Sequence, residues 1–69
     1  MRASIRVNGI EETLSTGTVL ALLRRRGIDA GARGLAVAIN GAVLPRNRWE
    51  SAALRPGDEV EIVRPFAGG

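Results

Sequence analysis

Alternating hydrophobic and polar residues near both ends of the chain predict strands with one buried face. Residues 2–7 place three apolar side chains on one side and polar side chains on the other, and residues 59–63 alternate in the same way. The dipeptide Asn8-Gly9 is a strong hairpin signal, so we expect a returning strand over residues 10–14. Glu12 interrupts the alternation of this strand, which is tolerated at the edge of a sheet.

A short helix is predicted over residues 19–26, because apolar residues recur at i, i+3 and i+4 from Val19. Thr18 is well placed to cap its N-terminus, and Gly27 to end it in a left-handed conformation. Arg24–Arg26 then occupy the last turn, where positive charge favours the negative end of the helix dipole. This structural interpretation explains the arginine run better than a nucleic-acid site does.

Residues 35–39 form a nearly continuous apolar run between Gly34 and the turn signal Asn40-Gly41. Such a run predicts a central strand with both faces covered. A short strand over residues 42–44 should follow the turn and stop before a proline. The rest of the chain predicts an irregular or single-turn segment over residues 46–53 and a Pro-Gly turn over residues 55–58.

The order of these elements predicts an α+β fold, in which one small mixed sheet wraps a single helix. One helix covers only one face of such a sheet. We also expect the last strand to lie in the interior of the sheet, beside the first strand. The length of 69 residues allows one domain, residues 1–69, with residues 64–69 as a mobile tail.

Composition removes most side-chain chemistry. The chain has no cysteine, histidine, lysine or tyrosine, so the usual nucleophiles, general bases and soft metal ligands are missing. The net charge of +3 is compatible with nucleic acid or with an acidic protein partner. The N-terminal residues lack the apolar region of a signal peptide, and no apolar run reaches membrane-spanning length. We therefore expect a soluble cytoplasmic protein that is a monomer when free.

The dipeptide Gly68-Gly69 is the most informative feature of the chain, and we expect it to be the true C-terminus. Glycines have no side chain and accept almost any backbone angle, so this end could thread a narrow tunnel and present its carboxylate to another protein. The alternative is that glycines fray at chain ends. Because side-chain chemistry is so scarce, the reacting group is expected to be the terminus itself.

The chain resembles the ThiS family, the bacterial sulfur carriers of thiamin thiazole synthesis, which have the β-grasp or ubiquitin-like fold. The resemblance covers essentially the whole chain, and the combination of its motifs is specific. The residues that carry it are Asn8-Gly9, Gly17-Thr18-Val19, Leu22-Leu23, Val37–Gly41, Val43–Arg46, Trp49, Leu54, Pro56–Val63 and Gly68-Gly69.

The resemblance implies a protein cosubstrate and not an enzyme. A ThiF-like enzyme would use ATP and magnesium to adenylate the carboxylate of Gly69, and a sulfur donor fed by a cysteine desulfurase would convert it to a thiocarboxylate. ThiG, the thiazole synthase, would then take the sulfur. Gly68 and Ala67 would thread the partner's tunnel. The chain itself would bind no cofactor, metal, nucleic acid or membrane.

Three aromatic or basic residues are candidates for partner contacts. For Arg46 and Trp49 a partner contact and a structural role at the sheet edge weigh about equally. Phe66 lies beyond the last strand, which favours a partner pocket. The chain departs from the ThiS pattern at two places. Pro65 resembles the related MoaD carriers, and the run Arg24–Arg26 is more basic than expected of ThiS.

Three alternative functions stay open at this point. The first is a MoaD-like carrier for molybdopterin or another sulfur pathway. The second is a small basic TGS-like RNA-binding module, which the scarcity of aromatic residues disfavours. The third is a ubiquitin-like modifier of lysines.

Overall fold

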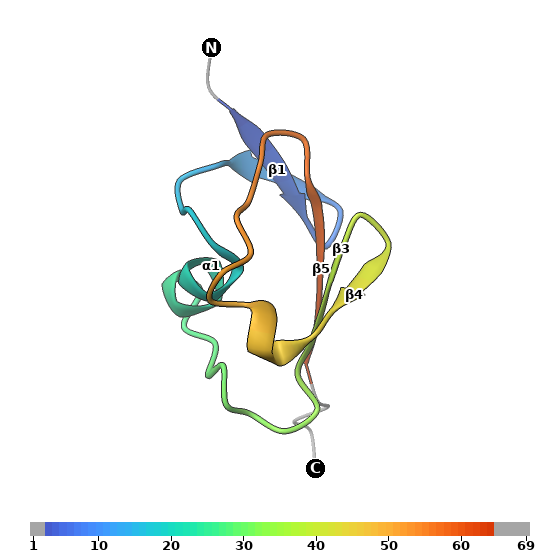
Figure 1. Ribbon diagram of the computed structural model, residues 1–69. Coiled ribbons are helices and arrows are strands. Elements are labelled where there is room, and N and C mark those ends of the chain that lie inside the picture. The colour runs from blue at the N-terminus through green and yellow to red at the C-terminus, as the bar shows by residue number, and fades with distance from the viewer. Residues whose placement is uncertain (1–2, 65–69) are drawn as a thin grey trace.

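The computed structural model describes residues 3–64. Its elements follow the expected order along the chain (Figure 1). They are β1 (Ser4–Val7), β2 (Ile10–Thr13), α1 (Val19–Arg25), β3 (Ala36–Ile39), β4 (Ala42–Leu44), the single 3₁₀ turn η1 (Arg46–Arg48) and β5 (Glu59–Val63). The predicted strands and the helix are therefore confirmed within one or two residues at each end. The segment predicted over residues 46–53 begins with the 3₁₀ turn Arg46–Arg48 and is irregular beyond it.

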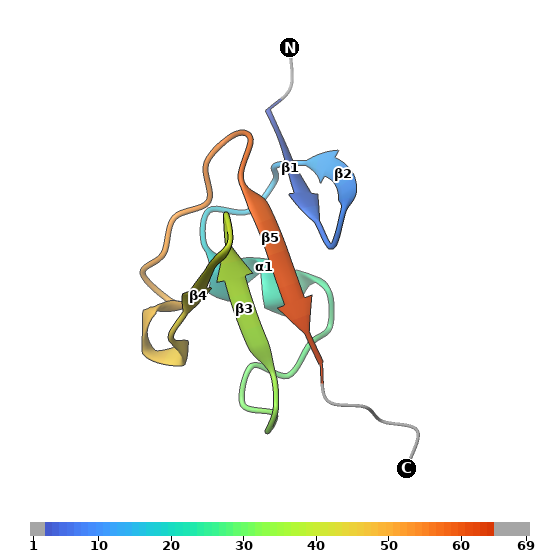
Figure 2. The same cartoon turned by 90° about the vertical axis from the view of Figure 1, so that its right-hand side faces the viewer.

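The strands form one five-stranded sheet in the order β2-β1-β5-β3-β4. β5 lies at its centre, parallel to β1 and antiparallel to β3, whereas the two hairpins supply the outer strands (Figure 2). The expectation that the last strand lies beside the first is confirmed. The position of β2 at an edge is confirmed as well.

Helix α1 lies across one face of the sheet, behind β3 and β5 in the view of Figure 2. The Thr18 hydroxyl accepts a hydrogen bond from the Ala21 N–H at 3.2 Å, and so caps a backbone donor that the first turn leaves unpaired. Gly27 has a φ of +73°, the left-handed conformation that ends a helix. Both predicted helix signals are confirmed.

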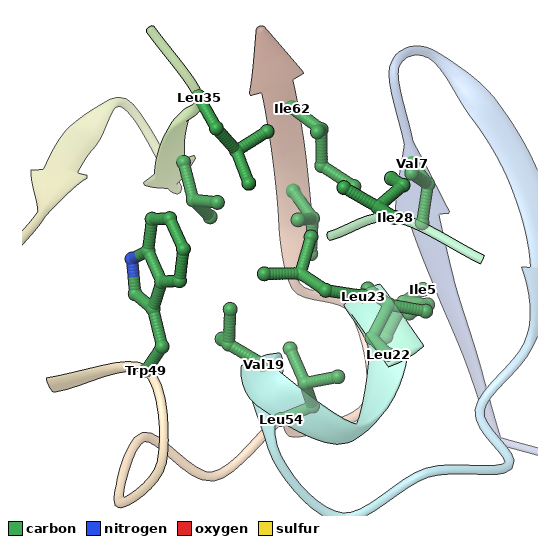
Figure 3. Packing of buried hydrophobic residues seen from close by; sticks show 12 residues of the cluster. Ile5, Val7, Val19, Leu22, Leu23, Ile28, Leu35, Trp49, Leu54 and Ile62 are labelled. Carbon is green, nitrogen blue, oxygen red and sulfur yellow. The ribbon is translucent and has the colours of Figure 1, made fainter. Parts of the chain in front are cut away.

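The core lies between α1 and the sheet and is closed on one side by Trp49 (Figure 3). Its fully enclosed side chains come from α1 and from the inward positions of β1, β3 and β5. Each such aliphatic side chain contributes about 1.5–3 kcal/mol when taken out of water. The buried residues are Ile5, Val7, Val19, Leu22, Leu23, Ile28, Leu35, Val37, Trp49, Leu54, Val60 and Ile62.

The expectation that both faces of residues 35–39 are covered is wrong. Leu35 and Val37 are buried against the helix, but Ala36 is exposed and Ala38 is only half-buried. The chain has one helix, and it covers only the inner face of this sheet. The apolar run arises because small alanines occupy the outward positions of β3.

Among residues 3–64, no helix is long and apolar enough to cross a membrane.

Candidate functional site

The predicted reacting end, Gly69, lies outside the described residues, as do the tail residues Gly68, Ala67 and Phe66. The structure does describe the base from which these residues continue. Strand β5 ends at Val63, and Arg64 is the last described residue. β5 is the central strand of the sheet, with β1 on one side and β3 on the other, so the tail begins from a strand in the sheet interior.

The outer face of the sheet, which α1 does not cover, is apolar over β3, β4 and the end of β5. Val43 is 78% exposed and Val63 is 60% exposed, and Ala36 and Ala38 lie between them across the strands. These four residues, which we call the apolar patch, surround a shallow hollow together with Glu61. A contiguous exposed apolar patch is a candidate contact surface, and this patch adjoins the base of the tail because Val63 directly precedes Arg64.

The other half of the outer face is charged. Arg6 on β1 lies opposite Glu11 on β2 and Glu59 on β5. Together with Glu61 on β5, these residues carry one positive and three negative charges next to the apolar patch. The outer face is therefore acidic, although the whole chain has a net charge of +3.

Arg46 points into the loop that connects α1 to β3. Its guanidinium donates hydrogen bonds to the carbonyl of Ala32 at 2.8 Å, to that of Leu35 at 3.4 Å, and to that of Ala30. The same group stacks over the ring of Trp49, with 4.7 Å between Cζ and the ring centre. Arg46 therefore holds an irregular loop that has few backbone partners of its own.

The structure corrects the expectation of a partner contact through Trp49. The side chain is only 3% exposed, and its Nε1–H donates to the Leu44 carbonyl at 3.0 Å. A ring so enclosed has no surface left for a partner, because the core and Arg46 cover it. Of the two roles weighed for Trp49 from the sequence, the described contacts support the structural one.

The arginine run at the end of α1 also has a structural role. Arg24 and Arg25 lie in the last helical turn, near the negative end of the helix dipole. Arg26 forms an ion pair with Glu12 of β2 at 2.8 Å, which joins the helix end to the sheet edge. Glu12, which seemed out of place in the strand pattern, is thus paired.

Among residues 3–64 no group of three or more acidic side chains is arranged to hold a metal ion.

The hydrogen bonds made by two asparagine side chains to β5 could not be predicted from the sequence. Asn8 binds the backbone of Ile62, and Asn40 binds the backbone N–H of Glu59. The two Asn-Gly dipeptides predicted the turns, but they did not indicate what the asparagine side chains bind. The exposed valines were also missed, although an apolar residue at the outward position of a half-buried strand was a usable signal.

A mixed five-stranded sheet with a central last strand and one helix across its inner face defines a ubiquitin-like β-grasp domain. The ThiS family model matches residues 4–69, and this chain therefore belongs to the ThiS family.

Solved structures agree with this assignment. A crystal structure of the thiamine biosynthesis protein ThiS from Geobacter metallireducens is 30% identical, covers 96% of this chain and 99% of that chain, and superposes with a TM-score of 0.76. An NMR solution structure of a thiamine biosynthesis protein from the same organism is 29% identical, covers 96% and 87% of the two chains, and has the same TM-score.

A thiazole synthase from Paramagnetospirillum magneticum is 38% identical over 64 residues. The match covers 91% of this chain but 19% of the synthase, so this chain spans about a fifth of the length of that relative. In that organism a ThiS-like segment is therefore part of a much longer chain that is named as the synthase.

Proposed function

We propose that this protein is a sulfur carrier of thiamin thiazole synthesis, whose working group is the C-terminal carboxylate of Gly69. The observation that carries the proposal is that the match to the ThiS family runs through residue 69 and so includes Gly68-Gly69. The composition supports it, because a chain without cysteine, histidine, lysine and tyrosine has little other chemistry to offer.

The proposed chemistry takes two steps. The Gly69 carboxylate attacks the α-phosphorus of ATP on a ThiF-like enzyme and displaces pyrophosphate, giving an acyl-adenylate. In the second step, the outer sulfur of a persulfide supplied by way of a cysteine desulfurase attacks the acyl carbon and displaces AMP. A thiol of the donor then cleaves the acyl disulfide, which releases the thiocarboxylate and leaves a disulfide on the donor. ATP and magnesium belong to the partner in this proposal, and the chain acts as a cosubstrate and not as a catalyst.

Thiazole synthase is the proposed acceptor of the sulfur. The support for it is the relative from Paramagnetospirillum magneticum, in which a ThiS-like segment and a thiazole synthase name occur in one chain. A carrier that must meet the synthase in every cycle would gain effective concentration from such a linkage. Because the activating enzyme consumes ATP, we propose that the protein works in the cytoplasm.

We further propose that the outer sheet face docks these partners. The apolar patch of Ala36, Ala38, Val43 and Val63 adjoins the base of the tail, so a partner seated on it would be close to the emerging chain. The carboxylates of Glu59 and Glu61 flank the patch on β5. The complementary partner surface is therefore apolar with basic residues beside it.

The experiment that tests the carrier function is an intact mass measurement. The protein is incubated with a ThiF-like enzyme, ATP, magnesium and a sulfur source. A mass increase equal to the difference between sulfur and oxygen is expected, and it should disappear when Gly69 is deleted or when one residue is added after it. Equal sulfur loading of the truncated protein would refute the proposal. A MoaD-like carrier would pass its sulfur to a molybdopterin pathway. Transfer of the sulfur to thiazole synthase would therefore distinguish the proposed carrier from a MoaD-like one.

A further inference from the structure

Asn8 and Asn40 bind the two ends of β5 in closely similar ways. Each begins an Asn-Gly turn and has a φ of +51°. The Asn40 side chain accepts a hydrogen bond from the Glu59 N–H at 2.9 Å and donates to the Asp58 carboxylate at 3.0 Å. It therefore acts where β5 begins, at the end of the strand remote from the tail.

The Asn8 side chain acts where β5 ends. It accepts a hydrogen bond from the Ile62 N–H at 2.8 Å and donates to the Ile62 carbonyl at 3.3 Å. One carboxamide thus satisfies both polar backbone groups of a single residue. Ile62 is two residues before Arg64, the last described residue of the chain.

The register explains why a side chain is needed at this position. Along the parallel ladder, the Arg6 N–H donates to the Asp58 carbonyl and the Asn8 N–H donates to the Val60 carbonyl, so the next rung falls on Ile62. At a φ of +51° the backbone of Asn8 has already turned into the hairpin. If β1 continued, its backbone would form the hydrogen bonds to Ile62. The Asn8 carboxamide forms them in its place.

β5 continues past the β1–β2 hairpin turn (Figure 2). Its other side remains paired with β3 as far as Val63, which lies opposite Ala36. Within residues 3–64, the hydrogen bonds that hold Ile62 from the β1 side come from Asn8. Asn8 is therefore placed to set the direction in which the chain leaves the sheet.

We propose that Asn8 is a positioning residue for activation of the C-terminus: by holding Ile62 it fixes the direction in which the chain leaves β5 at Val63, and so favours entry of Gly69 into the partner's site. This inference rests on the proposed carrier function. Only correctly aimed molecules would bind productively, and apparent affinity falls in proportion to that fraction. Once the tail has entered, Gly69 occupies the same position in every molecule, so the chemical step is unaffected.

The matched test compares Asn8→Gly with Asn40→Gly. Glycine accepts the positive φ at both positions, so each variant keeps its turn and loses two side-chain hydrogen bonds to β5 or its flanking residue. Urea midpoints establish whether both variants are folded at the assay temperature. The measurement is pyrophosphate release by a ThiF-like enzyme as a function of carrier concentration.

For Asn8→Gly we expect KM for the carrier to rise about three- to tenfold with kcat unchanged, the pattern of a reduced competent fraction. Asn40→Gly should keep both constants within about twofold, the ordinary scatter for a change remote from the site. Equal rises of KM in two folded variants, or a loss confined to kcat, would overturn the proposal. Should Asn8→Gly unfold, Asn8→Asp replaces it, because aspartate tolerates the same φ but cannot donate to the Ile62 carbonyl.

Backbone ¹⁵N relaxation gives a second readout that does not depend on any partner. In Asn8→Gly the order parameters of Val63 and Arg64 should drop from about 0.85 toward 0.6, while those of β3 stay unchanged. Asn40→Gly should leave Val63 and Arg64 as they are. Unchanged order parameters at these residues in Asn8→Gly would refute the role of Asn8. This measurement does not depend on sulfur loading, so the role of Asn8 and the proposed carrier function can be refuted separately.

Discussion

The Arg46 guanidinium stacks over the Trp49 ring, with 4.7 Å between Cζ and the ring centre, and it also donates to carbonyls of the loop before β3. One exposed cation thereby joins an irregular loop to the core. The contact shows how a domain with so few buried residues stabilises a connection that has little secondary structure.

Replacing Arg46 by alanine should lower the free energy of unfolding by about 1–2 kcal/mol, because carbonyls of the 30–35 loop lose a charged donor. Arg46→Lys should recover only part of this, since a single ammonium cannot reproduce the planar fork. Urea denaturation measures both. The neighbouring exposed Arg48 is the control, and Arg48→Ala should change stability by less than about 0.5 kcal/mol. Equal effects at the two positions would contradict this account of Arg46.

Trp49→Ala should be far more damaging. Removing a large buried aromatic side chain costs about 3–5 kcal/mol, which is most of the stability of a small domain. Trp49→Phe keeps part of the volume but loses the donor to the Leu44 carbonyl, so we expect a loss of about 1–3 kcal/mol. Thermal unfolding followed by circular dichroism measures both variants. A Trp49→Ala protein as stable as the wild type would mean that the ring is not part of the core.

Val43→Asp tests the proposed docking face. A carboxylate in the apolar patch should raise the dissociation constant for the ThiF-like enzyme about tenfold, the effect of a moderate interface residue. Ile10→Asp is the matched control, because Ile10 is also on an edge strand and is 71% exposed, but lies at the opposite edge of the sheet. Calorimetric titration gives both constants. If Ile10→Asp weakened binding as strongly, the docking face would have to be placed elsewhere.

Gly68→Val tests threading of the tail. The variant should fold like the wild type, yet fail to gain sulfur in the mass assay, because a β-branched side chain would not fit a tunnel shaped for glycine. Phe66→Ala should instead weaken partner binding by about 2–4 kcal/mol, the size of an aromatic hot spot. Normal loading of Gly68→Val would show that the terminal carboxylate reaches its site without a narrow passage.

Nucleic-acid binding should be weak and nonspecific. The arginines at the end of α1 lie at a helix terminus, and Arg26 is paired with Glu12. Fluorescence anisotropy with generic RNA at physiological salt should give dissociation constants no tighter than about 10⁻⁴–10⁻⁶ M. Nanomolar, sequence-selective binding would favour the TGS-like alternative.

Features set by neighbouring residues could be predicted from the sequence. The Asn-Gly turns, the Thr18 cap and the Gly27 helix end depend on local backbone angles and hydrogen bonds. The alternation of residues 59–63 likewise indicated which side chains of β5 are buried. Together with the family resemblance, these patterns were sufficient for the fold class and for the order of its elements.

Features that depend on residues distant in the sequence were decided by the tertiary structure. Whether Trp49 covers the core or meets a partner depends on how the ring packs against the cluster between α1 and the sheet, which no local pattern reports (Figure 3). The run at residues 35–39 could not show that one helix leaves its outer side open. The bond from Asn8 to Ile62 joins residues 54 positions apart, and it exists because the parallel pairing of β1 with β5 brings the hairpin turn beside the end of β5.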